Sequence, residues 1–167
     1  MEVSTLQDLL RDPTKKHIVD TVDALGLGSA EVGANYHDAQ HLKAPLTSVA
    51  LVLEQQHTLY IAHDTTVPWG VLKVGRKHLF YSKPRGGFIE MDPLCVLDFY
   101  VHPDRQRHGL GLHLFTSMLE RESVAPHQLA YDRPSPKLFP FLRKHFKLDS
   151  YVPQSNRFVV YDAYFSA

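Results

Sequence analysis

The stretch LCVLDFYVH at residues 94–102, followed by QRHGLG at residues 106–111, decides the fold. The first part is mostly apolar and typical of a buried strand, and the second is typical of a glycine turn at the start of a helix. A strand that ends in this way directs several backbone N–H groups at one point, which suits a pyrophosphate. The only cysteine of the chain, Cys95, lies on this strand. Together these features indicate an enzyme that uses a phosphate-bearing cofactor.

Length and composition limit the kind of protein. The chain has 167 residues, 44% of them hydrophobic and 22% charged, and is expected to form a single domain over residues 1–167. The formal net charge is zero, which gives no drive toward nucleic acid or an anionic membrane. One cysteine excludes an internal disulfide and a cysteine-rich zinc site, and it fits a reducing compartment. Residues 1–11 are expected to form a loosely ordered extension without a secretory signal, and no apolar run is long enough to cross a bilayer.

Hydrophobic periodicity predicts helices in the first third of the chain. A helix is expected over residues 12–25, ended by Gly26 and Gly28. A loop is expected to follow over residues 33–45. Residues 47–55 fit a short helix better than a strand, because Val52 breaks the apolar alternation.

Beyond this segment the pattern changes to strands. They are predicted at residues 58–62, 69–74, 78–82, 88–91, 94–102, 128–131, 147–152 and 158–164. Helices are predicted after Gly111 and from Ser135, and Pro140 is expected to kink the second of them or to remove one of its hydrogen bonds. The order predicts a mixed α/β (α+β) domain built on one central sheet.

The motif Gln106-x-x-Gly109-x-Gly111 is the first candidate site. Glycine lets the backbone approach a phosphate closely, and the following helix adds its positive end. The spacing lacks the third glycine of a dinucleotide fingerprint and the Gly-Lys-Ser/Thr end of a P-loop. An ordinary strand-to-helix turn is the alternative.

Cys95 and Asp132 are candidate reactive side chains. A lone cysteine on an apolar strand is more often a small buried hydrophobe, and a function for it needs a titrating partner nearby. Asp132 ends a strand ahead of a helix, so it is either a turn former or a base that faces a cleft. Ser135 caps that helix and could meet a phosphate, while Lys137 and Lys144 belong either to the same anion site or to a solvated helix face.

A metal site is not expected. His37 and His41 have the spacing of a zinc hydrolase helix, with Asp38 after the first of them. Aspartate is shorter than the glutamate that this motif requires, the segment lacks helical periodicity, and no third ligand is evident.

Longer strings of residues resemble a known family. Three of them, at residues 93–102, 106–109 and 126–135, closely resemble the α-tubulin N-acetyltransferases of the GNAT acetyltransferase superfamily. Shorter matches lie at residues 39–45, 72–75 and 152–154. The resemblance spans nearly the whole chain from about Asp12. It implies a GNAT fold, with a mixed, mostly antiparallel central sheet flanked by helices.

The resemblance also implies an activity and a set of site residues. The activity is transfer of an acetyl group from acetyl-CoA to a lysine of α-tubulin that faces the microtubule lumen. Catalysis is implied for Gln40, Cys95 and Asp132. Acetyl-CoA binding is implied for Phe99, Tyr100, Val101, His102, Gln106, Arg107, His108, Gly109, Leu110, Gly111, Leu112, Ser135, Lys137 and Lys144. Substrate contact or site shape is implied for Lys73, Lys77, Asp98 and Arg133. The implied protein is a monomer of the cytoplasm and its microtubules, in a cilium or flagellum, without a metal.

The implied chemistry requires a base. A lysine ammonium has a pKa of about 10.4, so it must lose a proton before it attacks a thioester. Asp132 is the preferred base, with Cys95 as a second participant and Gln40 in a positioning role, while backbone N–H groups after Cys95 are expected to stabilise the oxyanion. We expect direct attack in a ternary complex rather than an acetyl-cysteine intermediate. The alternatives are an acetyltransferase for another amine or protein, and a protein that binds CoA or tubulin without turnover.

Overall fold

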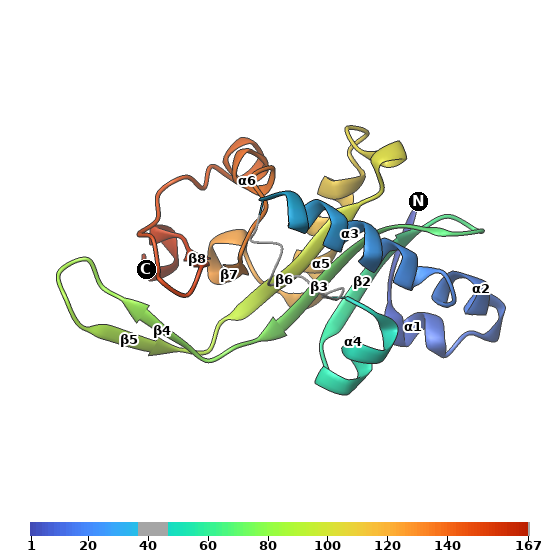
Figure 1. The fold of residues 1–167 in the computed structure, drawn as a ribbon, viewed down its shortest axis with the longest axis horizontal. Helices are drawn as coiled ribbons and strands as arrows, with labels where there is room; N and C mark the ends of the chain where they lie inside the picture. The colour runs from blue at the N-terminus through green and yellow to red at the C-terminus, as the bar shows by residue number, and fades with distance from the viewer. Residues whose placement is uncertain (37–46, 167) are drawn as a thin grey trace. The chain divides into compact units, whose positions relative to one another are not determined.

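The computed structural model describes residues 1–36 and 47–166. They form a larger sheet with strand order β1-β2-β3-β6-β7-β8 and a two-stranded sheet, β4-β5 (Figure 1). The pairs β1–β2, β4–β5 and β7–β8 are antiparallel, and the pair β6–β7 is parallel. The mostly antiparallel sheet flanked by helices confirms the predicted mixed α/β fold class.

The elements have the following bounds. The strands are β1 Glu2–Thr5, β2 Thr58–His63, β3 Pro68–Arg76, β4 Leu79–Ser82, β5 Phe88–Met91, β6 Leu94–Val101, β7 Leu129–Asp132 and β8 Phe158–Val160. The α-helices are α1 Leu6–Leu10, α2 Lys16–Val19, α3 Val22–Tyr36, α4 Val49–Gln55, α5 Leu110–Glu122 and α6 Leu138–Phe146. Short 3-10 helices lie at Pro13–Lys15, Pro103–Arg105, Pro126–Gln128 and Asp162–Phe165.

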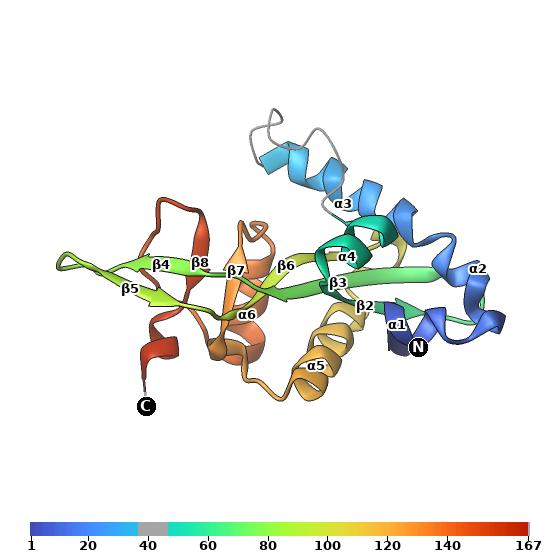
Figure 2. The ribbon, with the colours of Figure 1, turned by 90° about the horizontal axis from the view of Figure 1, so that it is seen from below.

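The chain divides into two compact units, which are described separately. Unit 1 comprises Met1–Lys73 and Asp98–Glu122, and unit 2 comprises Val74–Leu97 and Ser123–Ala167. In unit 1, helices α3 and α4 lie on one face of strands β2 and β3, and helix α5 lies on the other (Figure 2). The turn that contains the glycine motif therefore belongs to unit 1, whereas Cys95 and Asp132 belong to unit 2.

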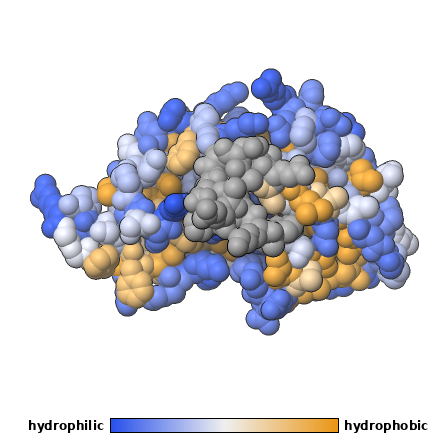
Figure 3. Space-filling view, in the orientation of Figure 1, coloured by the Kyte–Doolittle hydropathy of each residue, from blue (hydrophilic) through white to orange (hydrophobic). Residues whose placement is uncertain are grey.

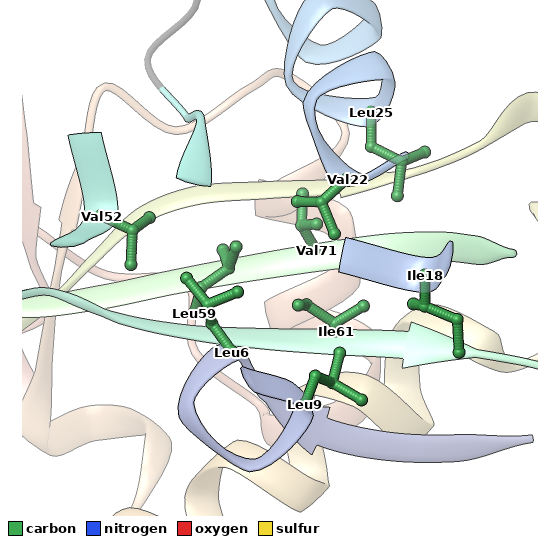
Figure 4. Close-up of a cluster of buried hydrophobic side chains, with 9 residues drawn as sticks. All are labelled: Leu6, Leu9, Ile18, Val22, Leu25, Val52, Leu59, Ile61 and Val71. Atoms are coloured by element: carbon green, nitrogen blue, oxygen red, sulfur yellow. The ribbon is translucent and has the colours of Figure 1, made fainter. Parts of the chain in front are cut away.

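The core of unit 1 explains the order of its N-terminal segment. Nine buried side chains from α1, α2, α3, α4, β2 and β3 pack into one apolar cluster (Figure 4). Leu6 and Leu9 of α1 belong to this cluster, and β1 pairs with β2. Thr5 and Asp8 cap the start of α1 reciprocally. Residues 2–10 were expected to be loosely ordered and instead form a strand and a helix, because apolar burial and capping hold them.

The predicted helix over residues 12–25 is wrong in its extent. The segment divides into a 3-10 turn, α2 and α3, and α3 runs through Gly26 and Gly28 to Tyr36. A Cβ atom at Gly26 would overlap the carbonyl of Thr47, and one at Gly28 would lie 2.8 Å from the Tyr100 hydroxyl. These glycines therefore allow close packing inside a helix rather than ending it. The predicted loop is wrong over residues 33–36, and its remainder lies outside the described residues.

Several predictions near the C-terminus also need correction. Residues 147–152 contribute an isolated bridge, Tyr151 to Tyr161, instead of a strand, and β8 ends at Val160 ahead of a 3-10 turn. Helix α6 begins at Leu138 rather than at Ser135, which places Pro140 in its first turn. An N–H group there has no partner within the helix, so proline removes no hydrogen bond and needs no kink.

Unit 2 also carries the β4–β5 hairpin. One face of the hairpin packs into an apolar cluster through Leu79, Tyr81 and Met91. The other face carries Phe80 and Phe88, which are exposed. Figure 3 shows the tip of the hairpin at the left as hydrophilic, with hydrophobic side chains next to it. Among the residues that the structure describes, no helix has the length and apolar character needed to cross a membrane.

The short helix α4 confirms the prediction for residues 47–55. Ser48 caps it, because its hydroxyl accepts a hydrogen bond from the Leu51 N–H at 3.1 Å. Gln56 ends the helix in the left-handed conformation.

Candidate active site

Cys95 lies in the core of unit 2. It is the second residue of β6, it is fully buried, and it packs into an apolar cluster contributed by β4, β5, β6, β7 and β8. Its Sγ atom donates a hydrogen bond to the carbonyl of Pro93 at 3.4 Å. Cys95 is therefore a core residue, and a role in the chemistry would have to be exercised by a thiol that is shielded from solvent.

The surroundings keep this thiol protonated. The pKa of Cys95 is raised to about 12, first by burial and second by the negative charge of Asp132. A hydrogen bond from the backbone N–H of Lys77 and the charges of Lys77 and Arg76 act in the opposite direction and are outweighed. At neutral pH the side chain is thus a neutral thiol, which is a poor nucleophile and cannot act as a base.

Asp132 ends β7, the strand that runs parallel to β6. The register pairs Cys95 with Ala130, so Asp132 follows two residues further along β7. Its Oδ1 atom accepts a hydrogen bond from Arg133 Nε at 3.2 Å, and the side chains of Asp132 and Arg133 are 18% and 29% exposed. Asp132 is a partly exposed carboxylate whose negative charge acts on the Cys95 thiol.

The predicted substrate-contact lysines differ in exposure. Lys77 is exposed, and its N–H donates at 3.3 Å to the same Pro93 carbonyl that accepts the Cys95 thiol. Lys73, in β3, is only 4% exposed. Lys77 is thus accessible to solvent, whereas the burial of Lys73 suits a role within the sheet. Cys95, Asp132, Arg133 and Lys77 all belong to unit 2.

Asp98 holds together parts of unit 1 that are distant in sequence. Its two carboxylate oxygens accept hydrogen bonds from Ser29 Oγ at 2.7 Å and from Thr47 Oγ1 at 2.6 Å. Ser29 lies in α3 and Thr47 precedes α4, so the carboxylate ties both helical segments to β6. Sequence reasoning missed both hydroxyl residues, and no local signal marks them. Gln40 falls between Ser29 and Thr47 in the sequence and lies outside the described residues.

The glycine motif forms a turn of unusual backbone conformation. Arg107 and Gly109 have φ angles of 66° and 80°. The turn is fixed from within, because Gln106 Nε2 donates to the carbonyl of Val101 at 2.7 Å. Helix α5 starts at Leu110, and its first bond runs from the His113 N–H to the Gly109 carbonyl. The N–H groups of the first helical turn have no partner within the helix, so they can bind an anion.

Some residues implied to bind CoA act first in packing. The ring of Phe99 packs against Phe115 of α5, with centroids 5.8 Å apart. The ring of Tyr100 lies against Gly28 of α3. These side chains hold the helices on β6, so any contact of this part of the strand with a cofactor would use the backbone.

The second segment implied to bind CoA belongs to unit 2. The carbonyl of Ser135 accepts a hydrogen bond from the Leu138 N–H at 2.9 Å, in the turn that leads into α6. Lys137 and Lys144 are exposed, as is Arg143. Three cations on one short segment are suited to phosphate groups, as the sequence predicts.

The structure offers no group of three metal-binding side chains within residues 1–36 and 47–166. His37 and His41, which gave the discounted zinc interpretation, lie outside these residues.

Solved structures define the class of this fold. A GCN5-related N-acetyltransferase from Ralstonia eutropha superposes with a TM-score of 0.58 at 13% identity, over 92% of this chain and 94% of that chain. An AtaT mutant toxin bound to the C-terminus of the antitoxin AtaR and to acetyl-CoA gives a TM-score of 0.52 at 14% identity, over 74% and 79% of the two chains. The chain has the GNAT acetyltransferase fold.

Sequence comparison narrows this class to one family. Residues 3–167 match the family described as GNAT acetyltransferase, Mec-17, and the chain belongs to it. A protein of Phytophthora infestans named alpha-tubulin N-acetyltransferase is 50% identical over 161 residues, which cover 90% of each chain. Proteins named alpha-tubulin N-acetyltransferase from Tetrahymena thermophila and alpha-tubulin N-acetyltransferase 1 from Danio rerio are 49% and 44% identical over 76% and 90% of this chain. The chain spans 32% and 50% of the length of these two relatives.

Proposed function

We propose that this protein transfers the acetyl group of acetyl-CoA to a lysine side chain of α-tubulin that faces the microtubule lumen. The observation that carries the proposal is the 50% identity, over 90% of both chains, to a protein named alpha-tubulin N-acetyltransferase. The geometry of unit 2 supports it. Asp132 is a charged proton acceptor, and Cys95 is held beside it on the parallel strand as a neutral thiol.

Acetyl-CoA is the proposed cosubstrate. Its diphosphate would be held by the backbone N–H groups of residues 107–112, because this turn has two positive φ angles and leads into the first turn of α5, where N–H groups have no partner within the helix. The family resemblance also implies phosphate contacts for Lys137 and Lys144. A structure of the same fold is described as bound to acetyl-CoA, which supports this cosubstrate. The chain itself connects the turn to Cys95 through β6.

The proposed reaction is direct attack in a ternary complex. Asp132 accepts a proton from the substrate ammonium, and the resulting amine attacks the thioester carbon, so that an N–C bond forms and the C–S bond breaks. The nitrogen loses two protons in all, one to Asp132 and then to solvent, and one to the leaving CoA thiolate. Backbone N–H groups of β6 after Cys95 stabilise the oxyanion, and Gln40 positions the lysine or a water molecule.

The state of Cys95 favours this route over an acetyl-cysteine intermediate. A covalent route needs a thiolate, and a pKa raised to about 12 leaves almost none at neutral pH. A fully buried thiol is also shielded from an incoming acyl group. The role left to Cys95 is structural: it shapes the site around Asp132 and excludes water from it.

Steady-state kinetics test the order of events. Varying acetyl-CoA at several fixed tubulin concentrations should give intersecting reciprocal plots, as expected for a ternary complex. Parallel plots, or an isolated acetyl-Cys95 that passes its acetyl group to tubulin, would overturn direct attack.

Substrate choice is tested by comparing polymerised tubulin with spermidine and histone peptides in an assay of CoA release. Turnover should be fastest with polymerised tubulin, and mass spectrometry should find the acetyl group on a lumenal lysine of α-tubulin. Faster turnover of a small amine would assign the protein to another acetyltransferase class. Uptake of acetyl-CoA without release of CoA would make it a binding protein.

The proposed partner and place follow from the substrate. The protein would act as a monomer on microtubules of the cytoplasm or of a cilium, without binding nucleic acid. Co-sedimentation with taxol-stabilised microtubules, and mass measurement in solution, test these two points separately.

A further inference from the structure

The turn between β2 and β3 contains a carboxylate with three donors. Oδ1 of Asp64 accepts hydrogen bonds from the N–H groups of Thr66 at 2.7 Å and Val67 at 2.8 Å. Its Oδ2 accepts one from the indole Nε1 of Trp69 at 2.8 Å. These bonds, that of Trp69 first, lower the pKa of Asp64 to about 2. A charged carboxylate therefore fixes the orientation of the indole ring.

The same indole ring contacts the approach to the glycine turn on two sides. The guanidinium carbon of Arg105 lies 4.3 Å from the centre of the ring. The ring of His102 meets it edge-on, with centroids 5.4 Å apart. In addition, the backbone N–H of His102 donates a hydrogen bond to the backbone carbonyl of Trp69 at 2.8 Å. Trp69 thus holds both ends of the short turn Pro103–Arg105 that leads into residues 106–111.

We propose that Trp69, oriented by Asp64, is a positioning residue that keeps the glycine turn in the conformation that binds the diphosphate of acetyl-CoA. This inference rests on the proposed function, because it needs a diphosphate at the turn. In this proposal the Arg105 side chain packs on the face of Trp69 and does not bind the diphosphate. The backbone N–H groups of the turn and Arg107 bind the diphosphate instead. All of these residues belong to unit 1.

The physical reason is the conformation of the turn. Arg107 has a φ angle of 66°, which is uncommon for a residue with a side chain and persists only when the surroundings impose it. Without the indole ring the turn would spend part of its time in other conformations. The apparent dissociation constant for acetyl-CoA would rise by the inverse of the fraction that stays competent.

The first experiment measures acetyl-CoA binding by calorimetry. Trp69→Leu should raise the dissociation constant about fivefold to tenfold, and leave kcat at saturating acetyl-CoA within about twofold, because the ring touches no reacting group. Trp69→Phe keeps an aromatic ring but loses the hydrogen bond to Asp64. Its dissociation constant for acetyl-CoA should therefore lie between those of Trp69→Leu and the unaltered protein. Phe80→Leu, which removes an aromatic ring that is 53% exposed in unit 2, is the matched control and should bind like the unaltered protein.

A second measurement separates positioning from a general loss of structure. S-acetylpantetheine donates the same acetyl group and carries no diphosphate. Trp69→Leu should lower kcat/KM for acetyl-CoA about fivefold to tenfold and leave kcat/KM for S-acetylpantetheine within about twofold. An equal loss with both donors would show a merely structural role and overturn the inference.

Two further readouts use features of this cluster. Trp69 is the single tryptophan of the chain, so its emission should change when acetyl-CoA binds, and this change should be absent with S-acetylpantetheine. Adding Arg105→Gln to Trp69→Leu should weaken binding by less than about twofold more, because Arg105 acts through the ring. Unchanged affinity in Trp69→Leu would overturn the inference alone. No uptake of acetyl-CoA by the unaltered protein would overturn the proposed function, and this inference with it.

Discussion

The glycine turn of unit 1 and the Cys95–Asp132 pair of unit 2 are built in opposite ways. The turn is exposed at Arg107, His108 and Gly109, and it offers backbone N–H groups in a conformation with two positive φ angles. The pair consists of side chains on two parallel strands, and the thiol is fully buried. Side-chain contacts stabilise the turn, whereas strand pairing and apolar packing hold Cys95 and Asp132 in place.

This contrast indicates which kind of change each region tolerates. At the turn, the conformation of the backbone matters more than the chemistry of the side chains. At the pair, the backbone is ordinary strand and the functional groups are side chains. Backbone changes at the turn should therefore alter the affinity for acetyl-CoA, and side-chain changes at the pair should alter turnover.

The largest effect is expected from Asp132→Asn. The amide keeps the shape of the carboxylate but cannot accept the substrate proton, so kcat should fall on the order of 100-fold or more. The dissociation constant for acetyl-CoA should stay within about twofold, since no diphosphate contact is assigned to Asp132. Rapid-quench turnover and calorimetry measure the two quantities.

Asp149→Asn is the control for this change. Asp149 is an exposed acid of the same unit that bonds to Ser150, and its loss should leave both quantities unchanged. A large loss of acetyl-CoA affinity in Asp132→Asn, with little loss of kcat, would remove Asp132 from the chemistry and blur the contrast between the two regions.

The next largest effect is expected from Gly109→Ala. A Cβ atom here would meet nothing within 4 Å, so the cost comes from the φ angle of 80° alone. The strain, roughly 1–2 kcal/mol, should shift the turn and weaken acetyl-CoA binding about tenfold, while kcat at saturation changes little. Gly86→Ala at the hairpin tip is the matched control, because Gly86 also has a positive φ, 96°, and open space around it. Equal loss in both variants would trace the effect to general strain.

The sequence predicts a region well when the residues that determine its structure are close together in the chain. The strand and glycine turn were predicted, because apolar residues, two glycines and the following helix lie within about thirty positions. The continuation of α3 through Gly26 and Gly28 was not, because it depends on Thr47 and Tyr100, which are distant in sequence. Local pattern alone cannot separate a glycine that ends a helix from one that admits a neighbour.

The same argument applies to the candidate site. Cys95 and Asp132 were singled out as side chains at particular places on strands, and the structure puts them on neighbouring strands of one unit. Asp98 accepts hydrogen bonds from Ser29 and Thr47, which lie 69 and 51 positions away in the sequence, and both were missed. The burial that raises the pKa of Cys95 is a property of the packed core, which sequence does not show.

A smaller effect, on stability rather than turnover, is expected for the buried thiol. The pKa of Cys95 is raised from 9.0 to about 12 by burial and the charge of Asp132. A raised pKa stabilises the folded state fully below pH 9 and progressively less as the pH rises toward 12, because the unfolded chain then loses its proton first. Relative to Cys95→Ala, the unaltered protein should lose about 1.4 kcal/mol of unfolding free energy between pH 7 and pH 10.

Urea denaturation at the two pH values measures this difference. Burial raises the pKa of Tyr131 and of Tyr161 as well, so both proteins lose stability at high pH and only their difference reports on the thiol. Equal losses in the two proteins would mean that the thiol ionises as readily in the folded chain, and that a thiolate is available for covalent chemistry after all.

A further effect on stability is expected from Ser29→Ala, which tests whether Asp98 has a structural role or acts on the protein substrate. The change removes one of the two hydroxyl donors of a carboxylate, and should cost about 1.5–3 kcal/mol of unfolding free energy while leaving acetyl-CoA affinity within about twofold. Ser117→Ala is the control, because Ser117 Oγ donates at 2.7 Å to a carbonyl of its own helix and should cost less. If Ser29→Ala instead leaves stability unchanged and lowers the rate on tubulin, Asp98 acts on the protein substrate, and unit 1 contributes side-chain chemistry as well as a backbone cradle.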